Sequence, residues 1–294
     1  MNRRSFLRAT GVSAALGVAG CLSESPERQK TSDVAERTTT ESTGVVETSA
    51  TASGSLSVAV DRLQSGVVLA GDDSIGVASD GRQFLYLDVE ASAIDASGTD
   101  APARDAFAFR FAGETHSSWR RSENAPLWRA WTDGDGDRYT AESESGWVLF
   151  ELPEAGDASD AALEWSGNGV AWRPPESLRA RLAAQPPSLS LDWPVPETTT
   201  HGETEIGFAV TNEGDRVGRF VGGLNETNIR TAYSPIEAFN RPVQPGETLN
   251  WTITHDNGVT LESDSVDDGE PDGAYVLSWQ GGTRRREISF GSDA

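Results

Sequence analysis

Residues 202–215 read Gly-Glu-Thr-Glu-Ile-Gly-Phe-Ala-Val-Thr-Asn-Glu-Gly-Asp. From Glu205 to Val210, large apolar residues alternate with polar or small ones, which is the period of a strand that buries one face. The Asn-Glu-Gly-Asp that follows is a turn signal, because Asn and Gly tolerate the positive φ angles of a hairpin turn. The stretch predicts a strand of an antiparallel sheet that ends in a tight turn near Asn212.

The same alternation recurs between turn signals along the rest of the chain from Ser55 onward. Further alternating runs lie at 56–60, 84–89, 106–111, 147–152, 249–253 and 275–279. Short strands at this spacing are typical of antiparallel β-sandwiches. One segment, 174–184, has the pattern of a helix, and Gln185-Pro186-Pro187 ends it and marks a domain boundary. The sequence therefore predicts an all-β chain with two sandwich domains, residues 55–185 and 187–294.

Both predicted domains resemble immunoglobulin-like families. In the first, residues 81–89 (Gly-Arg-Gln-Phe-Leu-Tyr-Leu-Asp-Val) and 146–153 (Gly-Trp-Val-Leu-Phe-Glu-Leu-Pro), followed by 163–165, resemble strands of the DUF4352 domain of bacterial and archaeal lipoproteins. An Asn that this family often carries after its first strand is missing here. In the second, residues 202–215 and Val-Gln-Pro-Gly-Glu-Thr at 243–248 resemble the CARDB domain. The resemblances imply two immunoglobulin-like β-sandwich domains, which carry no chemistry of their own.

The N-terminus resembles an export signal. Arg3 and Arg4 precede a mild apolar stretch at 9–20, which is shorter than the roughly 20 residues of a membrane-spanning helix. The arginine pair resembles the signal for twin-arginine translocation, a route that carries folded proteins across the membrane. Asn2 and Arg8 stand where that signal usually has Ser or Thr and Lys. The resemblance implies that residues 1–20 are a signal peptide.

The signal ends in Val-Ala-Gly-Cys at 18–21, which resembles a lipobox, and Cys21 is the only cysteine of the chain. In lipoproteins this cysteine is lipidated and becomes the first mature residue. The resemblance implies a membrane anchor on the outer face of the cytoplasmic membrane, at the cell surface. The alternative is that Cys21 is an ordinary small residue of the signal.

Residues 22–54 are rich in Ser, Thr and Glu and contain no aromatic residue. Such a segment cannot bury enough apolar surface to offset the entropy lost on ordering. We expect residues 21–54 to form a disordered tether with an average reach of about 30 Å, at 5–6 Å × √n.

The composition is strongly acidic, with 24 Lys and Arg against 46 Asp and Glu, a formal net charge of −22, and Lys30 as the sole lysine. Acid excess with few lysines resembles proteins of halophiles, in which concentrated salt screens the repulsion between carboxylates. The same charge repels nucleic acid, so no nucleic-acid partner is expected.

Residues 133–144 resemble a calcium loop, with carboxylates at positions 1, 3, 5 and 12. These are Asp133, Asp135, Asp137 and Glu144. Arg138 stands where the loop requires Gly, and its charge opposes cation binding. The favoured alternative is an acidic, solvated turn, and no other cofactor is predicted.

The stretch 116–131 combines tryptophan with arginine. Its candidate binding residues are Trp119, Arg120, Arg121, Trp128, Arg129 and Trp131. Trp and Arg often anchor interfaces, and Trp also stacks on sugar rings. The favoured alternative is a loop over the core, with its arginines stacked on indoles.

Two further patterns lie in the second predicted domain. Residues 284–286 are three arginines, which predict the charged face of an edge strand, with a small anion-binding patch as the alternative. Asn225 and Asn250 begin N-glycosylation sequons.

Motifs of catalysis are missing from the sequence, and its three histidines are scattered. The sequence therefore predicts a non-catalytic surface lipoprotein that binds or organises an unknown surface protein or glycan. The alternative is an extracellular glycan-active enzyme, or an accessory to one, that uses carboxylates in a sandwich groove.

Overall fold

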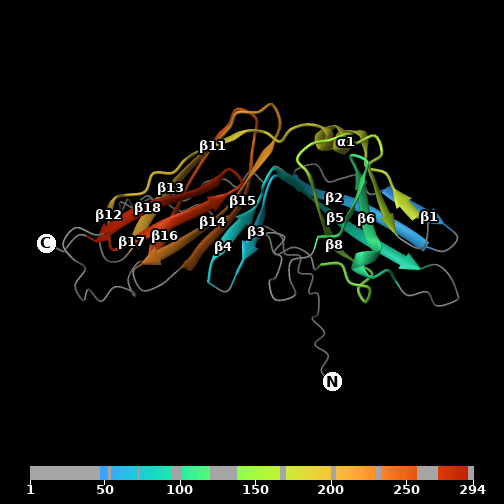
Figure 1. The fold of residues 1–294 in the computed structure, drawn as a ribbon, viewed down its shortest axis with the longest axis horizontal. Coiled ribbons are helices and arrows are strands. Elements are labelled where there is room, and N and C mark those ends of the chain that lie inside the picture. The colour runs from blue at the N-terminus through green and yellow to red at the C-terminus, as the bar shows by residue number, and fades with distance from the viewer. Residues whose placement is uncertain are drawn as a thin grey trace, which may run out of the picture. The chain divides into compact units, whose positions relative to one another are not determined.

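The computed structural model describes residues 47–51, 54–71, 73–93, 101–119, 138–165, 170–199, 203–228, 233–256 and 271–290. The chain divides into two compact units, 1–41 and 42–294, and all the described residues belong to the second. That part is mostly β-strand, with one short α-helix, so the all-β prediction is confirmed (Figure 1). Within the described ranges, no helix is both long and apolar enough to cross a membrane.

The first half of the described chain forms two four-stranded antiparallel sheets, with strand orders β1-β2-β5-β8 and β10-β9-β6-β7. Their strands are β1 (Glu47–Thr51), β2 (Gly54–Gln64), β5 (Arg82–Ala93), β6 (Phe107–Phe111), β7 (Glu114–Ser117), β8 (Ser145–Pro153), β9 (Ala162–Trp165) and β10 (Val170–Trp172). A short 3-10 helix, η1 (Arg104–Ala106), leads into β6. The predicted strands at 56–60, 84–89 and 147–152 lie within β2, β5 and β8.

A shared core fills the space between these two sheets. Alternation decides which side chains enter it: Phe107, Phe109 and Phe111 of β6 are fully buried, and the residues between them are half-buried. Helix α1 (Glu176–Ala183) closes this core with Leu178 and Leu182, which lie one turn apart on the same face.

The predicted helix at 174–184 is therefore confirmed, with slightly shorter bounds. Pro175 precedes its first turn, where the missing N–H costs nothing, and Glu176 and Arg181 match the helix dipole at its two ends. The helix ends before Pro186, because a residue preceding proline is pushed out of the helical region.

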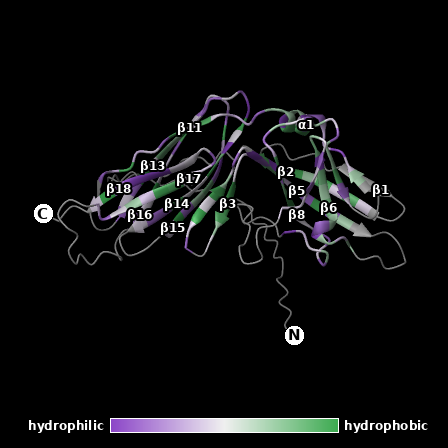
Figure 2. Cartoon of the chain, viewed as in Figure 1, coloured by the Kyte–Doolittle hydropathy of each residue, from purple (hydrophilic) through white to green (hydrophobic). Residues whose placement is uncertain are grey.

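The second half forms a three-stranded sheet, β11-β13-β16, and a five-stranded sheet, β12-β18-β17-β14-β15. Their strands are β11 (Leu189–Asp192), β12 (Thr198–Thr199), β13 (Glu203–Asn212), β14 (Gly218–Asn228), β15 (Ser234–Val243), β16 (Thr248–Asp256), β17 (Gly273–Trp279) and β18 (Gly282–Phe290). Ile206, Phe208 and Val210 of β13 are buried in the core between them, as the alternation predicts. Trp251 of β16 stacks on Phe208 with ring centroids 4.8 Å apart. Hydrophobic residues recur along the strands in the same way in both halves (Figure 2).

The turn near Asn212 forms where it was predicted, but by a different mechanism. Asn212 still belongs to β13, and its buried side chain holds the turn: Nδ2 donates to the carbonyls of Arg216 (2.7 Å) and Val243 (2.9 Å). Its Oδ1 accepts from the N–H of Gly214 at 2.9 Å. In the turn between β15 and β16, Gly246 does take a positive φ, of 70°. Asn212 is thus a side-chain cap, and the expectation of a positive φ there was wrong.

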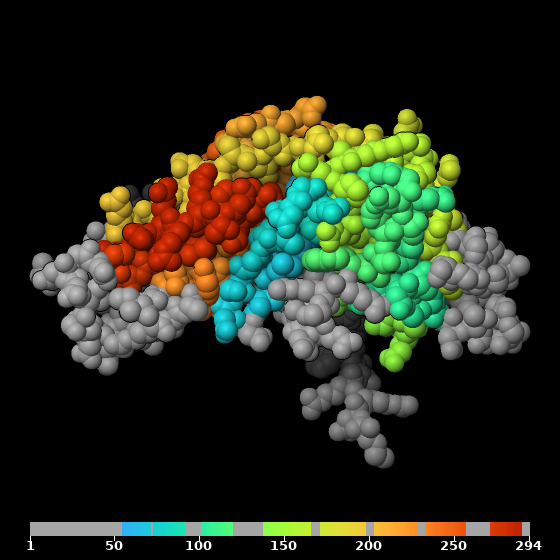
Figure 3. Space-filling model, in the orientation of Figure 1, coloured from blue at the N-terminus to red at the C-terminus, as the bar shows by residue number. Residues whose placement is uncertain are grey.

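A hairpin between the two halves was not predicted. β3 (Val67–Ala70) and β4 (Ile75–Ala78) pair with each other and pack on β14, β15 and β17 (Figure 3). Val68 and Ile75 of the hairpin form an apolar cluster with Val221 of β14 and Ala238 of β15. A segment from the first half of the chain therefore completes a face of the C-terminal sheet.

Candidate functional site

A narrow crevice lies where the end of β2, the segment after α1 and the start of β14 come together. It is lined by Leu63, Gln64, Ser65, Gln83, Arg181, Ala184, Pro186, Pro187, Arg216, Val217, Gly218 and Arg219. Its volume is about 40 Å³, roughly three times the 10–15 Å³ that a single water requires on the same measure. None of these described lining residues is Asp or Glu, although the chain carries 46 acids. The crevice is a basic site in an acidic protein.

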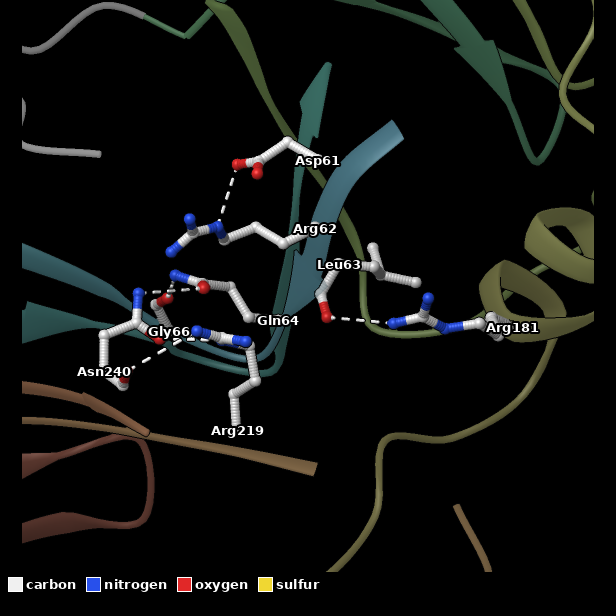
Figure 4. Close-up of polar contacts among 8 residues, drawn as sticks. All are labelled: Asp61, Arg62, Leu63, Gln64, Gly66, Arg181, Arg219 and Asn240. Carbon is white, nitrogen blue, oxygen red and sulfur yellow. Dashed lines mark hydrogen bonds and ion pairs between the residues drawn. The ribbon is translucent and has the colours of Figure 1, made fainter. Parts of the chain in front are cut away.

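Arg181 reaches the crevice from the last turn of α1. Leu178 and Leu182 anchor that helix in the core, so the position of Arg181 is set by packing around it. Its Nη2 donates to the carbonyl oxygen of Leu63 at 3.4 Å, a contact between α1 and β2 (Figure 4).

Arg219 reaches the crevice from β14. Its Nε donates to Oδ1 of Asn240 on β15 at 2.8 Å. The side chain of Gln280 binds the backbone of the same strand at two points. Its Nε2 donates to the carbonyl of Arg219 at 2.7 Å, and its Oε1 accepts from the N–H of Val221 at 2.8 Å. Asn240 and Gln280 thus hold the guanidinium and the backbone of Arg219.

Asn240 extends these contacts to the first half of the chain. Its Nδ2 lies 3.3 Å from Oε1 of Gln64, whose Nε2 in turn donates to the carbonyl of Gly66 at 2.6 Å (Figure 4). Gln64 is 5% exposed, so these bonds form away from bulk water. Arg219, Asn240 and Gln64 make a continuous polar chain from β14 to the end of β2.

Arg216 belongs to the turn before β14. Its Nη2 donates to the carbonyl of Gln185, which ties the turn to the segment after α1. Its Nε is 3.4 Å from Oδ1 of Asp215, but that carboxylate is 94% exposed. An ion pair so open to solvent contributes little and leaves much of the charge of Arg216 unscreened by protein.

A second polar contact lies between the hairpin and β14. Asn225 is 2% exposed, and its side chain pairs with the backbone of Ile75: Oδ1 accepts from N–H at 2.7 Å, and Nδ2 donates to C=O at 2.8 Å. N-glycosylation of Asn225 does not fit this fold, because the side chain is 2% exposed and a glycan on Nδ2 would have to enter a closed contact. Asn250 on β16 is exposed, and its glycosylation stays a prediction.

Of the six candidate residues in the Trp/Arg stretch, the structure describes Trp119. The centroid of its ring lies 5.5 Å from that of Phe84. The backbone N–H of Trp119 donates to the carbonyl of Leu149 at 2.6 Å. It covers part of an apolar cluster of Phe84, Tyr86 and Trp147. Trp119 thus packs over part of the core, but it is only half-buried, so its binding role stays a prediction. Arg120, Arg121, Trp128, Arg129 and Trp131 lie outside the described residues.

The predicted calcium loop is described only at its end. Asp133, Asp135 and Asp137 lie outside the described residues. Glu144 is in a turn with φ 54°, and its N–H donates to the carbonyl of Thr140 at 3.0 Å. Within the described ranges, no three His, Cys, Asp or Glu side chains are placed to hold a metal. The calcium site stays a prediction.

The three arginines of β18 lie beside a wide hollow of about 750 Å³ on the second pair of sheets. β12 pairs with only Ser289 and Phe290, so at residues 284–286 β18 has no neighbour on that side within the described sheet. Arg284 lies over the ring of Trp279 at 5.0 Å. The hollow is lined by Arg285 and Arg286, but also by the acids Asp192, Glu197 and Glu287. This mixture favours the edge-strand interpretation over an anion patch.

Three described groups have shifts in pKa. Burial raises the pKa of Tyr139 to about 12, with a smaller contribution from the negative charge of Glu144. Burial also raises the pKa of Glu237, and Arg241 opposes that rise. Hydrogen bonds from Ser159 lower the pKa of Asp157. None of the three groups lines the crevice.

The crevice could not be predicted from the sequence. Arg181, Arg216 and Arg219 are separated by up to 38 positions and come together only through α1, the turn after β13 and the packing of the hairpin.

No family model matches the chain, and comparison with curated protein sequences gives no match. Among solved structures, β-glucosidase from Listeria innocua in complex with isofagomine is similar at 14% identity and a TM-score of 0.29, over 36% of this chain and 16% of that one. A mutant of the same enzyme with laminaribiose gives 11% identity and a TM-score of 0.29, over 65% and 22%. The Pseudomonas fluorescens alkylpurine DNA glycosylase AlkC gives 8% and 0.29, over 37% and 32%. At this TM-score, the activities of those proteins do not bear on this chain.

Proposed function

We propose that the protein is a non-catalytic, lipid-anchored surface protein of a high-salt environment, whose β-sheet body binds or organises an extracellular protein or glycan. The observation that carries the proposal is the position of Cys21. The only cysteine of the chain follows Val-Ala-Gly at the end of an arginine-led apolar signal. In few sequences of this length would a single cysteine fall at this position by chance.

The arrangement after Cys21 supports the same function. Residues 22–46 have the composition of a flexible spacer, and an anchored body needs such a spacer to stand clear of the membrane. The predicted tether extended to residue 54, but Glu47–Thr51 pair with β2 as strand β1, so the spacer is shorter than predicted. The described body follows as packed sheets, in which the hairpin β3–β4 joins the first half to the second. Sheets joined in this way offer a stable surface to a partner.

The alternative of a glycan-active enzyme has less support among the described residues. Glycosidases use two carboxyls on either side of the scissile bond, one of them with a raised pKa. Burial raises the pKa of Glu237, and the charged group that acts on it is Arg241 rather than a second acid. The binding function is therefore the one that we propose.

Replacing the anchoring cysteine tests the proposal. In cells, Cys21→Ser should move the protein from the membrane fraction to the medium, or leave it attached only as an uncleaved form of higher mass. Ser23→Ala is the matched control and should stay lipidated and membrane-bound. A Cys21→Ser protein that keeps its lipid and its normal mass would overturn the anchoring.

The export route has its own test. Arg3→Lys combined with Arg4→Lys should block export, because twin-arginine translocation recognises the guanidinium pair. Arg8→Lys, which leaves the pair intact, should be exported normally. Normal export of the double variant would show that another route is used.

A further inference from the structure

We propose that the crevice is a binding site for a small monovalent anion, chloride or the carboxylate group of a small molecule, held between Arg181 and the turn that carries Arg216 and Arg219. The inference is independent of the proposed function. It assigns a ligand class to a site that the anchoring and export experiments do not touch.

The first argument is charge. Three guanidinium groups line the crevice, and none of its described lining residues is an acid. Acids outnumber bases by 46 to 24 in the chain, so a crevice whose charged lining residues are all basic is unusual in this protein. The carboxylate nearest to Arg216 among its contacts, Asp215, points into solvent and is 94% exposed. An anion that enters the crevice therefore meets positive charge in a chain that is acidic as a whole.

The second argument is the environment of these charges. Leu63, Ala184, Val217 and the two prolines 186–187 also line the crevice. Apolar walls leave less water around the charges than an open surface does, so a guanidinium attracts an anion more strongly there. Arg binds carboxylates well, because its N–H groups form a planar fork.

The third argument is size. A cavity of about 40 Å³ holds a chloride ion or one carboxylate group. A sugar ring or a nucleotide needs a pocket of several hundred Å³. The ligand class is therefore a small anion rather than a glycan.

The fourth argument is how the site is built. Its amides are already engaged: Gln64 donates to the carbonyl of Gly66, and Gln83 donates to the carbonyls of Pro153 (2.8 Å) and Leu182 (3.2 Å). Gln83 is 2% exposed, so it is a fixed part of the wall of the crevice. Arg181 comes from α1, and Arg219 comes from β14. A bound anion would join the two halves of the chain and stabilise the folded state by mass action.

The test is thermal unfolding of the full-length chain in three sodium salts at one ionic strength. At about 1 M salt the Debye length is about 3 Å in every case, so general screening is the same. Chloride and acetate fit the crevice, and gluconate is too large. If the anion is about ten times its Kd, binding should raise the melting temperature by about 3–6 °C over gluconate.

The variant that tests the site combines Arg181→Gln with Arg216→Gln. In it, the melting temperature in chloride should no longer exceed that in gluconate. The matched control is Arg285→Gln combined with Arg286→Gln, which removes the same charge from the exposed face of β18 and should keep the full advantage. Any effect of the salts on general solvation remains in both variants, so the difference between them reports the crevice.

The possible results are distinct. An advantage shared by chloride and acetate assigns both as ligands, and an advantage of one alone assigns that one. Equal melting temperatures in the three salts, or an advantage that the crevice variant retains, would overturn the proposal. If the Gln variant does not fold, line broadening of chloride in NMR can be compared between the wild type and Arg216→Gln alone, and equal broadening would also overturn it.

Discussion

The contact between the two halves of the chain has two sides of opposite character. On the hairpin side, where β3–β4 packs on β14, β15 and β17, Ile75 lies so close to Gly223 that an added Cβ would overlap its Cγ2. On the crevice side, where the segment after α1 approaches β14, the same two halves face each other across a cavity lined with arginine. The hairpin side is apolar and closed, and the crevice side is charged and open.

This difference separates two tasks. Close packing on the hairpin side satisfies the backbone and leaves no room, as is normal for a protein interior. An open, charged crevice adds little to stability. Its polar groups bind water in the unfolded chain and neutral protein acceptors in the folded one, and the difference in free energy is small. We infer that the hairpin side holds the halves together, which leaves the crevice side available for a ligand.

The largest effect is expected from Asn225→Ala on the hairpin side. It would leave the N–H and C=O of Ile75 buried without their partners, at a cost of about 1–3 kcal/mol for each group. We expect the free energy of unfolding, measured with denaturant, to fall by about 2–4 kcal/mol. Asn250→Ala, at the exposed second sequon, should change it by less than about 0.5 kcal/mol. Similar losses in both variants would show that the hairpin is not the structural side.

The next effect is expected from Gly223→Ala. The new methyl group would also approach Cβ of Ile75 to 3.0 Å and its carbonyl oxygen to 3.2 Å, so the hairpin must move. Overpacking of this kind costs about 1–3 kcal/mol. Gly76→Ala on the hairpin itself is the matched control, because its nearest neighbour would be the carbonyl of Leu69 at 4.0 Å. If Gly223→Ala proves as harmless as the control, the contact is looser than described.

The strands could be predicted from sequence because their signal is local. The alternation of Ile206, Phe208 and Val210 needs no knowledge of the partner strand, and it is confirmed by their burial. The hairpin was missed for the opposite reason. Val67–Ala70 and Ile75–Ala78 are four-residue strands without clear alternation, and what they bury lies about 150 residues further along the chain.

The candidate site could not be predicted because its parts are ordinary when taken one at a time. Arg181 is the basic residue expected in the last turn of a helix, and Arg216 follows an acid in a turn. The sequence drew attention instead to residues 284–286, whose clustering is visible along the chain. In space, acids lie beside those arginines around the hollow, whereas no acid is among the residues that line the crevice.

A smaller effect is expected from Gln64→Ala, where the two sides meet. This substitution removes the donor to the carbonyl of Gly66 and the acceptor for Asn240, both in a buried setting. We expect a loss of about 1–2 kcal/mol, since water from the crevice can replace part of what is lost. Chemical denaturation measures it, with Ser65→Ala as a neighbouring control on the rim. A loss well above that of Asn225→Ala would reverse the assignment of the two sides.

The smallest effect is expected from Arg216→Gln on the crevice side. The ion pair with Asp215 is open to solvent, and Gln keeps a donor that can reach the carbonyl of Gln185. In about 1 M sodium gluconate, which does not fill the crevice, the Debye length is near 3 Å and the loss of stability should stay within about 0.5 kcal/mol. In about 0.1 M salt the Debye length grows to about 10 Å, and one positive charge fewer increases the repulsion among the acids. The loss should therefore grow by a few tenths of a kcal/mol on dilution, while Gly223→Ala, which changes no charge, should cost the same in both buffers. A loss above about 2 kcal/mol in molar salt would mean that the crevice is a structural contact, and the contrast between the two sides would fail.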